Sequence, residues 1–301
     1  MIRPITLLFA FAAGGVLAQS AAPAPAWTQA SWHDEPALAS SAHGWKAVVS
    51  LTRGRLVYFG PADRDANLLF ATATRDDPAG WGGHRLWLGP QAAWAKIWPP
   101  PAAWEASGPQ SYTTADGQLR MEMPDAGDGW PRLTRTYHWD GATLVCGAEL
   151  SGGTKPAQVI QIMQVPPTNV IEAAIRPEPG APAGYVLLPA GQMPKRLAEF
   201  APPPHATREG TLLRLRYLAV ILKPGFRPQT LTGRSAGATL LVGRGGQNGP
   251  AVAEPDAGFF TQVYLGGHEP FIELEQLSPL FAAGASARFE TTLRALPTTR
   301  D

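Results

Sequence analysis

Alternating apolar and polar positions recur along most of the chain and predict an all-β protein. In residues 271–277, Glu273 and Glu275 fall on one face of a strand, and Ile272 and Leu274 fall on the other. The same alternation predicts strands at 46–51, 55–59, 119–123, 132–139, 142–150, 157–165, 184–188, 211–222, 239–242, 259–265 and 287–296. About a dozen antiparallel strands indicate a large sandwich of two packed sheets.

Composition agrees with this fold class. The sequence holds 32 Gly and 31 Pro and is only 16% charged, which is typical of many turns and few charged helices. Asp140-Gly141 is a strong two-residue hairpin signal, and only a short helical turn is expected near residues 91–97. No internal linker interrupts residues 45–297, so we expect one domain there.

The first residues have the features of an export signal. Arg3 precedes an apolar run over residues 5–17, which is too short to span a bilayer, and Val16-Leu17-Ala18 is a small-residue cleavage pattern. Residues 1–18 are therefore predicted to be a signal peptide, cleaved near Ala18. Residues 19–44 are rich in Ala and Pro and are predicted to be a linker. The protein is expected in the periplasm or outside the cell.

Charge and cysteine content exclude several classes. The net charge is +1 and falls to zero once Arg3 is removed with the signal, so there is no electrostatic case for nucleic acid binding. Cys146 is the single cysteine, so an intramolecular disulfide is impossible and the domain needs a hydrophobic core. The six His residues show no metal-ligand spacing, so we expect no metal site. We also expect no cofactor and no membrane span.

The hairpin that contains Glu273 offers candidate chemistry. If residues 266–269 form its loop, Tyr264 pairs with Phe271, and Gln262 pairs with Glu273. Tyr264, Gln262, Glu273 and Glu275 then share one face. Such a face suits acid–base work, sugar hydroxyls or a cation, although a solvated sheet surface is the alternative.

Lys223 follows the long predicted strand 211–222. Without a bulge it shares the face of Tyr217 and Ile221 and leans inward. It is expected to pair with a carboxylate of the groove or to contact a ligand; a surface position at a turn is the alternative.

Tryptophan is concentrated in one segment. Five of the ten Trp residues fall within residues 81–104, where Gly82-Gly83 permits tight backbone geometry. Arg85 alternates with Trp87, so the two share a strand face. The segment is either a hydrophobic lid at one end of the sandwich or a set of rings on which sugars stack.

Three blocks carry a family resemblance. Asn67-Leu68-Leu69, the Gly-Gly-x-Arg-Leu-Trp-x-Gly-Pro block at 82–90, and residues 271–279 followed by Ala283-Gly284 resemble the bacterial family of unknown function DUF4380. That family is similar to the galactose mutarotase-like supersandwich, and the resemblance covers most of residues 45–297.

The resemblance implies roles for particular residues. Glu273 corresponds to the general base of mutarotases, Glu275 stands where they have Gln, and Arg85 is the counterpart of a sugar-contacting Arg. Mutarotases also need a His as general acid, and residues 158–165, which are comparable, contain none.

Three functions follow as hypotheses. The first is an exported carbohydrate-binding protein whose ligand-binding residues are Arg85, Trp87, Glu275, Tyr264, Gln262 and Lys223. The second is a sugar epimerase or lyase-like enzyme with Glu273 as catalytic base, and the third is a structural envelope protein. The missing His favours binding over catalysis, since a well-placed proton donor contributes about 10²–10⁴ in rate.

Overall fold

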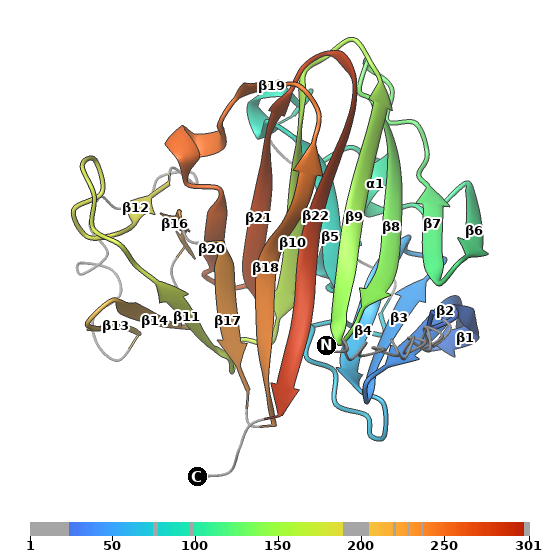
Figure 1. Ribbon diagram of the computed structural model, residues 1–301, viewed down its shortest axis with the longest axis horizontal. Helices are drawn as coiled ribbons and strands as arrows, with labels where there is room; N and C mark the ends of the chain where they lie inside the picture. The colour runs from blue at the N-terminus through green and yellow to red at the C-terminus, as the bar shows by residue number, and fades with distance from the viewer. Residues whose placement is uncertain are drawn as a thin grey trace, which may run out of the picture.

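A computed structural model describes residues 24–74, 78–96, 99–188, 205–218, 221–227, 229–235 and 237–297. Its antiparallel strands form three sheets (Figure 1). The all-β prediction is confirmed. The predicted signal peptide, residues 1–18, lies outside the described residues.

The first large sheet carries the candidate site residues on one face. Its strands run in the order β12 (Val186–Leu187), β16 (Pro224–Phe226), β20 (Thr261–Gly266), β21 (Ile272–Phe281), β10 (Ala157–Val165) and β5 (His84–Gly89), with β15 (Ile221–Leu222) beside β20 and β19 (Ala251–Ala253) beside β21. Every residue of β5 and β10 is buried, so this end of the sheet is covered on both faces.

The second large sheet has ten strands. Their order is β13 (Ala206–Glu209), β14 (Leu212–Arg216), β11 (Val170–Ala174), β17 (Thr230–Arg234), β18 (Ala238–Asn248), β22 (Gly284–Pro297), β9 (Thr143–Gly152), β8 (Arg132–Asp140), β7 (Gln118–Glu122) and β6 (Ser111–Ala115). The two large sheets pack face to face: Gln161 Nε2 on β10 donates to the Phe289 carbonyl on β22 at 3.2 Å. Leu274, Met163 and Leu293 are fully buried in this core.

A third sheet, of four strands, joins the side of the molecule. It consists of β1 (Thr28–Trp32), β2 (Glu35–Ala42), β3 (Trp45–Ser50) and β4 (Arg55–Pro61), and lies at the lower right in Figure 1. The linker prediction for residues 19–44 is wrong where the structure describes them, because residues 28–42 form two of these strands. Glu35 ties β2 to the turn between β3 and β4. Its carboxylate accepts a hydrogen bond from Arg53 Nη2 at 2.9 Å, and both side chains are fully buried.

The long strand predicted at 211–222 is also wrong. β14 ends at Arg216 in the ten-stranded sheet, and β15 belongs to the eight-stranded sheet. In β14, Leu213 and Leu215 are buried as the alternation predicted, but in β15 Leu222 is buried and Ile221 is exposed, so the predicted apolar face does not extend to Ile221. Lys223 therefore follows a strand of the site sheet.

Short helical turns complete the fold: η1 (Pro78–Trp81), η2 (Gln91–Ala93), α1 (Ala102–Glu105) and η3 (Pro255–Gly258). The turn predicted near residues 91–97 is present as η2. No helix among the described residues is long and apolar enough to cross a membrane.

Candidate functional site

One face of the eight-stranded sheet gathers polar side chains from four neighbouring strands. The backbone register places Arg85 opposite Ile162, Ile162 opposite Glu275, and Glu275 opposite Gln262. Gln164, Glu273 and Tyr264 form the adjacent row. Because side chains alternate across a strand, all of these point away from the core between the two large sheets.

The register of the hairpin differs from the prediction. Tyr264 pairs with Glu273 rather than Phe271, and Gln262 pairs with Glu275 rather than Glu273. The connection runs from Gly266 to Ile272 and is longer than the predicted loop. The error is two positions, which preserves the side-chain alternation, so the four predicted side chains still share one face.

Two glycines bring β5 into position. Gly82 and Gly83 both have φ of 77°, in the left-handed region. A Cβ on Gly83 would lie 2.2 Å from the Leu56 carbonyl oxygen, so only glycine fits there. The expectation of tight geometry at this pair is confirmed, and it sets Arg85 on the site face.

Arg85 and Glu273 meet on this face. Arg85 Nη1 lies 3.1 Å from Glu273 Oε1, and Gln164 Nε2 donates to the same oxygen at 2.8 Å. Arg85 and Glu273 are 2% and 6% exposed, so the pair has little contact with water. The sequence predicted both residues, whereas it noted Gln164 only as a place where His was missing.

Burial changes the acidity of Glu273. Loss of hydration raises the pKa of Glu273 to about 7; Arg85 opposes that rise, and the Glu275 carboxylate adds to it. Tyr264, across the hairpin, is shifted to a pKa of about 12 by burial and then by Glu273. Near neutral pH, Glu273 is therefore able to carry or release a proton, whereas Tyr264 keeps its own.

Glu105 of α1 is a site residue that the sequence analysis missed. Its Oε1 accepts from Arg85 Nη2, and its Oε2 accepts from Trp87 Nε1 at 3.0 Å and from Arg55 Nη2 at 3.2 Å. Burial would raise the pKa of Glu105, but Arg55 and Arg85 outweigh that effect and lower it. The available signal was a carboxylate directly after Trp104 in an apolar, Trp-rich segment.

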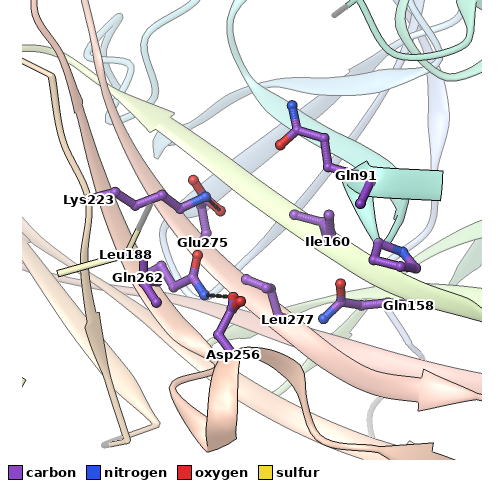
Figure 2. Close-up of a pocket in the computed structure, with 11 residues that line it drawn as sticks. Gln91, Gln158, Ile160, Leu188, Lys223, Asp256, Gln262, Glu275 and Leu277 are labelled. Carbon is purple, nitrogen blue, oxygen red and sulfur yellow. Dashed lines mark hydrogen bonds and ion pairs between the residues drawn. The ribbon is translucent and has the colours of Figure 1, made fainter. Parts of the chain in front are cut away.

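A pocket of about 410 Å³ opens beside these residues (Figure 2). Glu275 lines it and is held by Lys223, whose Nζ lies 2.8 Å from Glu275 Oε2. Gln262 also lines it and donates through Nε2 to Asp256 Oδ2 at 2.6 Å. The expected pairing of Lys223 with a groove carboxylate is present. Asp256, an exposed residue of η3, was not predicted.

The remaining lining mixes amides with apolar surface. Gln91 and Gln158 lie at the β5 side of the pocket, and Ile160, Leu188 and Leu277 supply apolar walls. Carboxylate, amide and ammonium groups around an apolar wall are typical of small-molecule pockets.

Trp87 lies away from the pocket lining. It is 8% exposed, Trp94 packs edge-on against it at 5.5 Å between ring centroids, and the Arg85 guanidinium lies 4.5 Å from its ring centroid. Trp81, Trp94 and Trp104 are buried as well, while Trp98 falls outside the described residues. The described Trp side chains of this segment are packed in the interior. Trp87 contributes to the site by donating a hydrogen bond to Glu105.

Histidine is absent from the described lining of the pocket. His84 is on β5 but faces the core, where its Nδ1 lies 3.2 Å from the Tyr137 hydroxyl, and burial holds its pKa well below the usual range. His138 lies on β8 in the other sheet. The described residues also contain no group of three or more His, Cys, Asp or Glu that could hold a metal ion.

Comparison of the structure with known proteins gives the fold family. A candidate aldose 1-epimerase from Escherichia coli K12 matches with a TM-score of 0.54 and 14% identity, over 86% of this chain and 98% of its own. A candidate mutarotase from Salmonella typhimurium matches with a TM-score of 0.53 and 12% identity, over 91% and 94%. The chain has a galactose mutarotase-like fold.

A galactose mutarotase-like protein from Lactobacillus casei ATCC 334 matches similarly, with a TM-score of 0.53 and 12% identity over 87% of this chain and 100% of its own. Identities this low show the fold and not the activity. No protein-family model and no curated protein matches the sequence, so membership of DUF4380 stays a prediction.

Proposed function

We propose that this galactose mutarotase-like protein is an exported saccharide-binding protein. The observation that carries the proposal is the pocket lined by Glu275, which Lys223 holds, by Gln262 on the neighbouring strand, and by Gln158, together with apolar walls. Sugar hydroxyls both donate and accept, so they match carboxylate, amide and ammonium groups, while sugar C–H faces match the apolar walls. The predicted signal peptide, residues 1–18, supports export.

The charges of the pocket favour a neutral sugar. Among the described lining residues there are two carboxylates, Glu275 and Asp256, and one ammonium group, that of Lys223. Lys223 is already paired with Glu275, so a ligand carboxylate would meet the surplus negative charge. Neutral hexoses are therefore expected to bind better than the corresponding uronic acids.

Titration calorimetry with galactose, glucose and their uronic acids tests this proposal, after a glycan array has identified a ligand. Glu275→Gln removes the charge that positions Lys223 and is expected to weaken binding about 10- to 100-fold, the usual worth of a hydrogen bond to a charged group. Asp63→Asn, at an exposed position outside the pocket lining, serves as the control and should bind as wild type does. Absence of binding across the array, or unchanged affinity in Glu275→Gln, would contradict the proposal.

A second candidate is a sugar epimerase with Glu273 as general base. The pKa of Glu273, about 7, is the specific observation that favours it, because a base works best when its pKa is near the operating pH. If this function holds, the protein speeds equilibration of α- and β-galactose, and Glu273→Gln reduces that rate by about 10² or more. Proton NMR of freshly dissolved sugar measures it.

The binding and rate measurements together separate the two candidate functions. A wild-type rate equal to that of buffer excludes the epimerase while leaving binding open. Absence of both binding and turnover would leave the structural envelope role as the remaining hypothesis.

A further inference from the structure

Glu105 links the buried charges of the site into one chain. Arg55 and Arg85 both bind its carboxylate, and Arg85 in turn binds Glu273. Glu105 is 4% exposed, and Arg55 additionally donates to its backbone carbonyl at 2.6 Å, so α1 is held at this spot from both side chain and backbone.

The arrangement divides the Arg85 guanidinium between two carboxylates. Its Nη2 atom is directed to Glu105, and its Nη1 atom lies 3.1 Å from Glu273. A bidentate arginine–carboxylate pair, with two parallel hydrogen bonds, is the strongest geometry for neutralising a carboxylate. In the described contacts Glu273 receives a single bond from Arg85.

We propose that Glu105 is a positioning residue: by holding Arg85 and Trp87 in place, it prevents Arg85 from pairing fully with Glu273 and so leaves Glu273 able to exchange a proton beside the saccharide pocket. The use of this proton at the saccharide pocket rests on the proposed function, whereas the effect of Glu105 on Glu273 does not. The protonation of Glu273 itself can be measured without any saccharide.

Other charged groups also face Glu273, and they determine what the test must hold constant. The charged groups are Arg85, Glu275 and Lys223. The titratable but uncharged Tyr264 also faces Glu273, with Glu269 near Tyr264. No hydrogen bond joins Glu105 to Glu273 among the described contacts, and Arg85 is the partner that both carboxylates share.

The test is a carbon-13 NMR titration of the glutamate side-chain carboxyls in the saccharide-free protein, with the Glu273 signal assigned by its loss in Glu273→Gln. In Glu105→Gln, Arg85 loses the charged partner of its Nη2 atom and can turn that atom toward Glu273 as well, so the proton affinity of Glu273 is expected to fall about tenfold or more. If Glu105 acted only through packing, the midpoint of the Glu273 titration would be the same in the variant as in wild type.

Charge balance calls for a second variant, because Glu105→Gln leaves two buried arginines facing a single carboxylate. The double variant Arg55→Gln with Glu105→Gln removes one charge of each sign and retains the Arg85–Glu273 pair. The same tenfold fall is expected. A wild-type titration of Glu273 in either folded variant overturns the proposal, and so does failure of both variants to fold, because Glu105 would then be a purely structural residue.

Discussion

Replacing Glu35 by alanine is expected to lower the free energy of unfolding by about 3–5 kcal/mol. Arg53, which binds Glu35 through Nε and Nη2, has a fully buried side chain and would keep its charge without that carboxylate. Ser50 Oγ, which donates to Glu35 Oε2 at 2.9 Å, would lose its acceptor as well. Urea unfolding followed by tryptophan fluorescence measures the loss.

Two further variants make that result specific. Asp63→Ala, at an exposed position after β4, should change stability by no more than about 0.5 kcal/mol. Glu35→Gln keeps the shape and an acceptor oxygen but not the charge, so its free energy of unfolding should lie between those of Glu35→Ala and Asp63→Ala. If Glu35→Ala unfolds at the wild-type urea concentration, the buried Glu35–Arg53 pair does not contribute to the stability of the domain.

Glu273→Gln is expected to become more stable relative to wild type as the pH rises. Burial raises the pKa of Glu273 to about 7 in the folded protein, against an ordinary value of 4.5. Between these values the folded state binds more protons than the unfolded state, so wild type loses stability as the pH increases through this window. Gln does not titrate. The free energy of unfolding of Glu273→Gln minus that of wild type should therefore increase by about 2 kcal/mol from pH 5 to pH 8.

Urea unfolding at several pH values measures that difference directly. Glu254→Gln, whose carboxylate is exposed, is the matched control and should show a difference from wild type that does not increase. An increase of the Glu273→Gln difference on acidification would show that the ionised form of Glu273 is the favoured one in the folded protein. That result would remove the support for a general base at this position.

The hairpin shows what the sequence can predict about the site. Alternation within each strand, together with an assumed register of the right parity, placed Gln262, Tyr264, Glu273 and Glu275 on one face. The register was wrong by two positions, because loop length is set by local turn geometry that composition does not specify.

Glu105 and Glu35 show where sequence reasoning fails. Each is a carboxylate in a segment interpreted by its composition: the Trp-rich stretch in one case and the Ala/Pro-rich stretch in the other. Their partners, Arg85 and Arg53, come from other strands, and such pairs depend on how strands meet in space. Alternation within a segment carries no information about partners in distant segments.

The Arg85–Glu273 pair joins residues 188 positions apart in the chain, with β10 lying between their strands. Such a site cannot form in a local fragment, because loop closure over most of the chain must precede it. Formation of the pocket is thus tied to completion of the eight-stranded sheet. A ligand that bound only the folded pocket would therefore stabilise the whole sheet and not just the strands it touches.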